Sequence, residues 1–432
     1  MLEILLKWNR WGENPLESGI PRNITPKIFS YCKGKEVIAL IGPRRAGKST
    51  VLYQIMDNLE AAGIAEEAML HINFEEPKLG PYLTLEGLDQ LYDCYREHIF
   101  PEGKAYLFLD EIQNILGWEK WVRARSETEE IKIFVTGSSA KLMSREIATL
   151  LTGRHFSFEI TPLEFSEFLT FKNIPVPKRR LPTNPSAKIK HALNVYLKWG
   201  GFPAVVLAKT GAIKEKILAE YFSDILFKDI VLRHAIRDAN QLQNLAIHLF
   251  SQTGKLLSFQ RIANTFQIST DMAMEYSRYI EEAFMVELIP YYSLKAAIRN
   301  RHPHKIHAVD LGLRNCVSLT NSEDEGRIVE SLVYNHLRKR YGDDNIFYWS
   351  GKNEVDFVIK EKNSITELWQ VVTGNLEDEA LLKRELQGLQ EALAIFPRAK
   401  AILVVKTMPK KGDALKSQFK GTLRALWQLL LE

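Results

Sequence analysis

The feature that most constrains this chain is the eight-residue segment GPRRAGKS at residues 42–49. It matches the pattern G-x-x-x-x-G-K-[ST] and stands between an apolar run at 36–41 and a helical pattern that starts near Lys48. Gly42 and Gly47 permit backbone conformations that point successive N–H groups at phosphate oxygens, and a helix amino terminus adds partial positive charge. The segment therefore predicts a phosphate-binding loop.

This loop predicts specific contacts with a nucleoside triphosphate and Mg²⁺. Lys48 is expected to reach the β- and γ-phosphates as a catalytic residue, and the Ser49 hydroxyl is expected to complete the Mg²⁺ shell. The predicted nucleotide-binding residues are Gly42, Pro43, Arg44, Arg45, Ala46, Gly47, Lys48, Ser49 and Thr50. Arg22 and Ile24, ahead of the first apolar run, are hypothesised to lie near the base.

A pair of carboxylates follows the apolar run YLFL, at Asp110 and Glu111. Asp110 is predicted to hold Mg²⁺, and Glu111 to orient or deprotonate the attacking water. The alternative is a strand that merely ends in acidic residues. The phosphate-loop motif upstream favours the catalytic interpretation, and Glu111 favours hydrolysis over nucleotide binding alone.

Hydroxyl and arginine side chains follow the next apolar run. Thr136, Ser138 and Ser139 are candidates for a sensor of the γ-phosphate or water, the alternative being an ordinary helix cap. Charge on the transferred phosphoryl group requires an arginine, which a neighbouring subunit can supply. Of Arg145 and Arg154, the sequence favours Arg154 as this catalytic residue.

The first 160 residues alternate short apolar runs with helical patterns. This arrangement predicts an α/β fold in which a parallel sheet is covered on both faces, with its ligand edge at the carboxyl ends of the strands. The predicted strands are residues 36–41, 69–74, 105–109, 131–136 and 155–160.

Composition excludes several classes of protein. Hydrophobic residues make up 46% and charged residues 25% of 432, which excludes a disordered chain. Three cysteines without C-x-x-C spacing do not suggest a disulfide framework or a zinc site. No apolar run reaches the ~20 residues that span a bilayer. We therefore expect a cytoplasmic protein without a membrane partner.

The motifs together resemble a prokaryotic, archaeal-type family of AAA-superfamily ATPases. The resemblance rests on GPRRAGKST, LFLDEIQN, VTGSSA and TGRHFSFEITPLEFSEF, and continues through WGGFP, KDI, DLGL and EVDF further along the chain. It implies ATP as the nucleotide, a P-loop core, a winged-helix-like middle and a nuclease-like C-terminal domain of unknown function. The absence of a guanine-binding N-K-x-D motif agrees with ATP.

Four regions follow from this reading. Residues 1–172 are expected to be the P-loop ATPase core, 173–236 a linker and helical lid, 237–312 a winged-helix-like domain and 313–432 a nuclease-like α/β domain. The 257–266 and 270–284 segments have helix-turn-helix spacing.

Residues 313–432 contain most of the catalytic residues of restriction-like nucleases, but not their lysine. Restriction-like nucleases use a helix Glu, a strand Asp and an E-x-K or Q-x-K on the next strand. Here these positions are Glu330, Asp356 and Gln370, but the lysine position holds Val372. We therefore expect a degenerate site that binds nucleic acid or is structural, with an active nuclease as the weaker alternative.

Basic residues gather in three segments although the formal net charge is only +4. Residues 173–190, 294–305 and 398–424 are each strongly basic, and the rest of the chain is acidic on balance. Basic segments of this kind are what a surface that contacts nucleic-acid phosphates would require. The alternative is that they are solvated loops. The candidate recognition helix is acidic, which argues against sequence-specific readout.

Two functions remain open on the sequence. The first is an ATPase that couples hydrolysis to nucleic-acid (DNA) binding or remodelling through backbone contacts. The alternative is a nucleotide-dependent regulatory switch that acts on a protein partner. An arginine supplied by a neighbouring copy would require a homo-oligomer.

Overall fold

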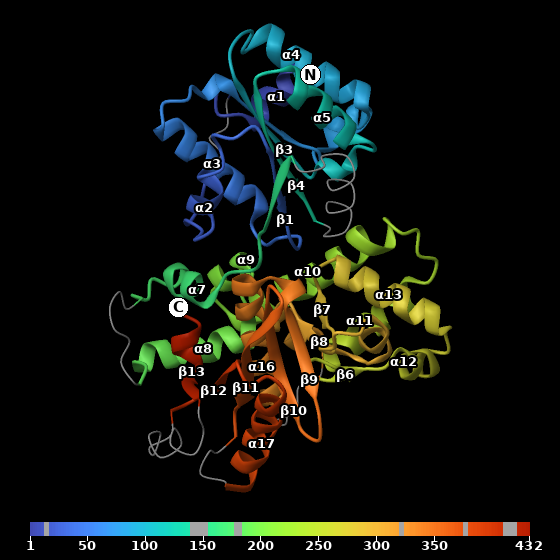
Figure 1. The fold of residues 1–432 in the computed structure, drawn as a ribbon. Coiled ribbons are helices and arrows are strands. Elements are labelled where there is room, and N and C mark those ends of the chain that lie inside the picture. Colours follow the sequence, from blue (N-terminus) through green and yellow to red (C-terminus); the bar gives the residue numbers. More distant parts are fainter. Residues whose placement is uncertain (13–16, 139–153, 177–183, 319–323, 375–378, 409–420) are drawn as a thin grey trace. The chain divides into compact units, whose positions relative to one another are not determined.

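The computed structural model describes residues 1–12, 17–138, 154–176, 184–318, 324–374, 379–408 and 421–432 (Figure 1). The chain divides into two compact units, Met1–Pro162 and Leu163–Glu432. The first unit ends earlier than the boundary expected at residue 172, so helix α7 (Phe165–Phe171) belongs to the second unit.

A five-stranded parallel sheet forms the centre of the first unit, in the order β2-β3-β4-β1-β5. This confirms the predicted α/β class. Strand β4 lies between β1 and β3, so the loop that follows β1 and the acidic end of β3 flank the end of β4. The strands are β1 (Val37–Ile41), β2 (Met69–Asn73), β3 (Ala105–Asp110), β4 (Ile131–Gly137) and β5 (His155–Glu159).

Alternation along these strands divides the apolar side chains into two layers. Val37 and Ala39 of β1 pack with α1 (Leu2–Trp8), α4 (Leu85–His98) and α5 (Trp118–Thr128). Ile38 and Leu40 pack on the opposite face with α2 (Thr25–Phe29) and α3 (Lys48–Ala61). Figure 1 shows α2 and α3 on one side of the sheet, and α1, α4 and α5 on the other. Each fully buried aliphatic side chain stabilises the fold by about 1.5–3 kcal/mol.

Helices dominate the first part of the second unit. The helical lid expected within residues 173–236 is interrupted, because α10 ends at Asp224 and the following turns form a π-helical segment, η4. The elements are α8 (Ala187–Trp199), α9 (Pro203–Leu207), α10 (Gly211–Asp224), η4 (Ile225–Val231) and α11 (Ala239–Ser251).

A helix-turn-helix and a small antiparallel sheet follow. α12 (Phe259–Phe266) ends at Gln267, whose φ of 53° is left-handed, and the Ser269 side chain caps α13 (Thr270–Glu282) by accepting from Met272 N. β6 (Leu256–Leu257), β8 (His304–Ala308) and β7 (Val286–Ile289) form the sheet in that order. Helix α14 (Ala296–Arg301) lies in the connection between β7 and β8.

The C-terminal part is a second five-stranded sheet, in the order β13-β12-β11-β10-β9. β9, β10 and β11 pair antiparallel, whereas β11, β12 and β13 pair parallel. Strand β13 had not been predicted. The elements are α15 (Leu311–Val317), α16 (Glu325–Tyr341), β9 (Ile346–Ser350), β10 (Glu354–Glu361), β11 (Ser364–Val372), α17 (Glu379–Ile395), β12 (Lys400–Val405), β13 (Gly421–Ala425) and α19 (Leu426–Leu429).

The WGGFP and DLGL segments meet inside the second unit. Asp310 caps α15 by accepting from Leu313 N at 2.8 Å, and its other oxygen accepts from Gly201 N at 2.7 Å. A Cβ on Gly312 would lie 2.0 Å from the Trp199 carbonyl oxygen. This close backbone approach explains why glycine stands at residue 312.

Gly312→Ala is therefore expected to destabilise the second unit. Because the clash is with backbone, relief requires moving α8 or α15, at a cost of about 1–3 kcal/mol in the free energy of unfolding. Urea unfolding followed by circular dichroism measures this cost. Gly80→Ala is the matched control, since a Cβ there meets no atom within 4 Å. Equal stability of the two variants would contradict the prediction.

No helix in the part of the chain that the structure describes is long and apolar enough to cross a membrane.

Candidate functional site

The phosphate loop connects β1 to α3 in the predicted position. Gly42 has φ 144° and Gly47, which precedes the first residue of α3, has φ 101°. A Cβ on Gly42 would lie 2.2 Å from the Ile160 carbonyl oxygen, so only glycine fits there. The loop therefore presents the backbone of residues 42–47 at the carboxyl edge of the sheet.

The Arg22 side chain contacts the backbone of this loop. This side chain is buried, and its guanidinium donates to Ala46 O at 2.8 Å and to Thr161 O at 2.9 Å. These two hydrogen bonds make Arg22 a positioning residue that ties the loop to the segment after β5. The hypothesis that Arg22 and Ile24 lie near the base stays a prediction.

Lys48 and Glu111 face each other in this site. Lys48 is buried, donates to Gly42 O at 3.1 Å and Pro43 O at 3.2 Å, and places Nζ 3.4 Å from Glu111 Oε1. Glu111 adopts a left-handed backbone conformation with φ 54°, which costs a non-glycine residue about 1 kcal/mol or more. Gln113 donates to the other carboxylate oxygen at 2.6 Å. The two predicted catalytic groups are thus adjacent.

Asp110 is buried at the end of β3, beside the first turn of α3. Burial alone would raise the pKa of its carboxyl group, but the neighbouring His71 and hydrogen bonds from Ser49 and Thr136 outweigh burial and lower it. The carboxylate therefore stays ionised. A carboxylate and a hydroxyl oxygen, the predicted pair Asp110 and Ser49, are donors of the kind that Mg²⁺ prefers.

His71 and Gln113 lie in the site but were not predicted from the sequence. His71 Nε2 lies 3.9 Å from Asp110 Oδ2, and it has no hydrogen-bond partner among the described residues. A single imidazole inside the apolar run of β2 is the one signal that pointed to it. Gln113 stands two residues after Glu111 and had no signal beyond that proximity.

The predicted sensor residues lie at the end of β4. The Thr136 hydroxyl donates to Asp110 Oδ1 and accepts from Glu111 N at 2.8 Å. The Thr136 hydroxyl therefore positions Asp110 and Glu111. Its proton is used in the hydrogen bond to Asp110 and is not available to a phosphate in this structure. Ser138 is buried beside it, whereas Ser139 lies outside the described residues.

The predicted arginines occupy different places. Arg44 pairs with Glu75 beside the loop, and Arg45 has a left-handed φ of 68° within it. Arg154 precedes β5 at the amino end of the sheet, where its side chain is 63% exposed and pairs with Glu127. This corrects the prediction for the chain's own nucleotide, because the phosphate loop is at the opposite end of β1. As a residue donated to a neighbouring copy, Arg154 stays a prediction, and Arg145 lies outside the described residues.

A second group of charged residues is buried in the second unit, and we call it the Lys305 cluster: Lys305, His307, Glu330, Glu354 and Asp356. Lys305 Nζ of β8 lies 2.6 Å from Glu330 Oε1, 3.0 Å from Asp356 Oδ1, and also pairs with Glu354. Burial would lower the pKa of Lys305, but the three carboxylates raise it well above its usual value. The cluster therefore holds an ammonium ion among carboxyl groups.

Burial also shifts the pKa values of two other members of the cluster, Glu330 and His307. Burial and the nearby Asp356 raise the pKa of Glu330 to about 8. Burial and the Lys305 charge hold the pKa of His307 well below its usual value, so this imidazole is neutral. His307 Nδ1 contacts the Ser331 hydroxyl at 2.9 Å, and Nε2 faces Glu330 Oε1 at 3.6 Å.

The structure brings together the three residues of the predicted nuclease-like site. Gln370 Oε1 accepts from Asp356 N at 3.3 Å, and its Nε2 donates to Glu385 at 2.7 Å. Val372 is buried in the core, as an apolar side chain requires. A different lysine, Lys305, enters the site from β8, 51 positions before Asp356, which the sequence pattern did not reveal.

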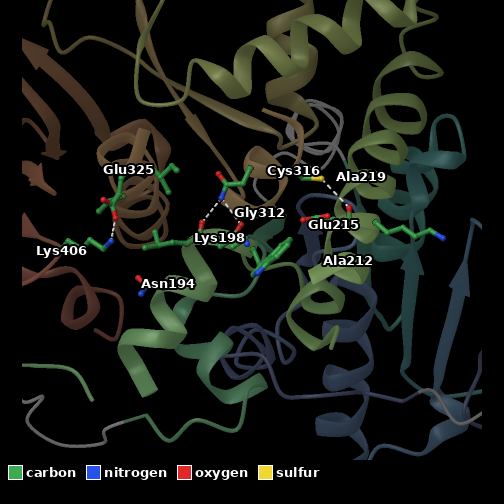
Figure 2. A pocket seen from close by; sticks show the side chains of 15 residues that line it. Asn194, Lys198, Ala212, Glu215, Ala219, Gly312, Cys316, Glu325 and Lys406 are labelled. Atoms are coloured by element: carbon green, nitrogen blue, oxygen red, sulfur yellow. Dashed lines mark hydrogen bonds and ion pairs between the residues drawn. The ribbon is translucent and has the colours of Figure 1, made fainter. Parts of the chain in front are cut away.

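A separate pocket of about 920 Å³ lies among α8, α10, α15 and α16 (Figure 2). Some of its polar side chains are engaged with neighbours. Asn315 donates to Leu197 O and Lys198 O at 3.0 Å each. Lys406 pairs with Glu325, as a dashed line in Figure 2 shows. We therefore assign no ligand to this pocket.

The geometry of the first unit defines a class: it is an AAA-type P-loop ATPase domain. Residues 34–169 match the family described as an AAA domain. Residues 190–324 and 325–408 match two further families, each described as a domain of unknown function (DUF8612 and DUF4143).

The chain belongs to a family with archaeal and bacterial members. The uncharacterized protein MJ1544 of Methanocaldococcus jannaschii is 36% identical over 385 residues, covering 87% of this chain and 81% of that protein. An uncharacterized protein of Haemophilus influenzae is 31% identical over 349 residues, covering 79% and 84%.

Similarity to solved structures is weaker. The Orc1 protein of Aeropyrum pernix, solved in complex with DNA, gives a TM-score of 0.34 at 13% identity, covering 69% of this chain and 92% of that one. The signal-transduction ATPase PH0952 of Pyrococcus horikoshii gives 0.28 at 11% identity, covering 76% and 46%. At these scores we base no argument on either structure.

Proposed function

We propose that the first unit binds ATP with Mg²⁺ and hydrolyses it, and that the chain couples hydrolysis to contacts with the nucleic-acid backbone. The observation that carries the ATPase proposal is the 3.4 Å approach of Lys48 to Glu111, beside Asp110 and Ser49. A cation for the phosphates, a general base and a Mg²⁺ ligand set thus meet at one edge of the sheet, as hydrolysis requires.

Each of these residues has a separate role in the proposed reaction. Ser49 and Asp110 would hold Mg²⁺, which neutralises charge on the β- and γ-phosphates. Lys48 would exchange its contacts with Gly42 O, Pro43 O and Glu111 for the phosphates. Glu111, released from that ion pair, would accept a proton from the attacking water, while Gln113 fixes the other carboxylate oxygen.

The second unit supports a nucleic-acid partner through its helix-turn-helix region, which we propose is a winged helix. A helix, a strand, two helices and a hairpin follow in the order α11, β6, α12, α13, β7 and β8. Helix α14, in the hairpin connection, carries Arg299 and Arg301, and Lys295 precedes it. This exposed basic connection is suited to phosphate oxygens.

Two basic residues of this region, Arg278 and Lys305, are paired with carboxylates and are not placed to contact bases. On α13, Arg278 lies 3.5 Å from Glu282 and 3.9 Å from Glu275, so it is held by its own helix. Lys305, counted among the basic residues in the sequence, is buried and pairs with carboxylates. These placements support backbone contacts without base readout.

The test is the ATPase rate with and without single- and double-stranded DNA. We expect DNA to stimulate turnover, and we expect binding to weaken by about tenfold or more between 50 and 200 mM salt. Replacement of Lys295, Arg299 and Arg301 by Ala should remove most of the stimulation and leave basal turnover intact. Lys27→Ala, on exposed α2 surface, is the matched control.

An ATPase rate that does not change when DNA is added, at either salt concentration, would contradict the coupling to nucleic acid. The intact site would then favour the regulatory switch that acts on a protein partner. A chain that binds no ATP would contradict the ATPase proposal itself.

A further inference from the structure

We propose that Lys305 takes the place of a divalent cation in the Lys305 cluster, so that this site binds such a cation only when the ammonium group is removed or withdrawn. The site lies in the second unit and does not involve the phosphate loop. It is defined by Glu330, Asp356 and Glu354 as carboxylate ligands, with His307 as a nitrogen ligand.

The position of the ammonium group is the first argument. Nζ lies 2.6 Å from Glu330 Oε1 and 3.0 Å from Asp356 Oδ1, and it also contacts Glu354. A divalent cation bound by the same oxygens would lie about 2.0–2.6 Å from each, so it would overlap Nζ. Lysine and metal are therefore mutually exclusive in this geometry.

His307 provides the second, independent argument. Its side chain is fully buried, and Nε2 has no hydrogen-bond partner among the described residues. This nitrogen faces Glu330 Oε1 at 3.6 Å, while Nδ1 contacts Ser331. A buried imidazole nitrogen that faces carboxylates without a hydrogen-bond partner can act as a metal ligand, and the carboxylates of the cluster suit Mn²⁺.

The origin of the residues suggests how withdrawal could occur. Lys305 and His307 lie on β8, in the region that matches DUF8612, whereas the three carboxylates lie in the region that matches DUF4143. Moving β8 would take both the ammonium group and His307 away from the carboxylates, whereas reorientation of the Lys305 side chain alone would leave all four ligands in place. Glu354, with its side chain 36% exposed, gives the otherwise buried cluster an edge toward solvent.

The described residues contain no cluster of three His, Cys, Asp or Glu side chains already arranged for a metal. This agrees with carboxylates that are set around an ammonium ion. Metal binding is therefore expected to appear as a gain when Lys305 is replaced.

The experiment measures Mn²⁺ binding to the full chain without nucleotide, by isothermal titration and by loss of the free-Mn²⁺ paramagnetic resonance signal. Lys305→Met is expected to bind Mn²⁺ about tenfold or more tightly than wild type. Adding Asp356→Asn should remove this gain. Lys209→Met, which changes an exposed lysine of the second unit, should match wild type. Equal affinity of wild type and Lys305→Met, or a gain that survives Asp356→Asn, would overturn the proposal.

Lys305→Met leaves three carboxyl groups without their cation, so folding is monitored by thermal unfolding with and without Mn²⁺. A second variant, Lys305→Met with Glu354→Gln, keeps Glu330 and Asp356 as ligands and removes one charge. If either variant folds only with Mn²⁺, the metal has replaced the ammonium group and the proposal stands. If neither folds with Mn²⁺, or both fold and bind none, it fails.

Discussion

Glu111→Gln is expected to leave ATP binding intact and to lower turnover by about 10²- to 10⁴-fold, the usual contribution of a general base. The amide keeps the size and the hydrogen-bonding oxygen of the carboxylate but cannot accept a proton at neutral pH. Because Glu111 touches Lys48 at 3.4 Å and Gln113 at 2.6 Å, its side chain is already held in place. The loss should therefore be confined to chemistry.

The measurement combines steady-state ATPase assays with titration of a fluorescent ATP analogue. Glu130→Gln is the matched control, since Glu130 is exposed and precedes β4 at the far end of the sheet. Normal turnover by Glu111→Gln would show that another group accepts the proton. A parallel loss of affinity would show that Glu111 acts mainly through Lys48.

Lys48→Ala is expected to lower the affinity for ATP by about ten- to a hundredfold. A hydrogen bond that involves a charged group contributes about 1.5–3 kcal/mol, and each 1.4 kcal/mol corresponds to about tenfold in affinity. Lys48 is buried and points at the loop carbonyls of Gly42 and Pro43, so no other described lysine can readily replace it. Turnover should fall with affinity.

Binding of the fluorescent analogue, with and without Mg²⁺, measures the change. The substitution also removes the partner of Glu111, so thermal unfolding must show that the variant is folded. Lys27→Ala, at an exposed position of α2, should bind as wild type does. Unchanged affinity in a folded Lys48→Ala protein would contradict the assignment of the phosphate loop.

Local sequence patterns predicted the central sheet well. The five apolar runs became β1 to β5 with small changes at their ends, because each is short and rich in apolar residues. The phosphate loop was equally readable, since strand, glycines and helix start are adjacent in sequence. The acidic pair followed from its place at the end of an apolar strand.

Residues whose roles depend on distant partners were harder to predict. Arg154 stands only a few positions before the end of β5, yet it lies at the amino end of the sheet because that strand runs parallel to β1. Thr136 was a candidate sensor of the γ-phosphate or water, and its contact with Asp110 could not be predicted, because it arises from the pairing of β4 with β3. Strand direction and order decide both placements.

The sequence by itself determined that this chain holds a phosphate loop and an acidic pair at the ends of buried strands, because those features are set by neighbouring residues. Only the tertiary structure decided that Thr136 joins the acidic pair and that Lys305 enters the carboxylates of Glu330 and Asp356. The physical reason is that these contacts arise from strand pairing and packing between segments far apart in the chain. A buried charged group is stable only with a partner of opposite charge or a hydrogen bond, and the fold supplies that partner from a distant segment.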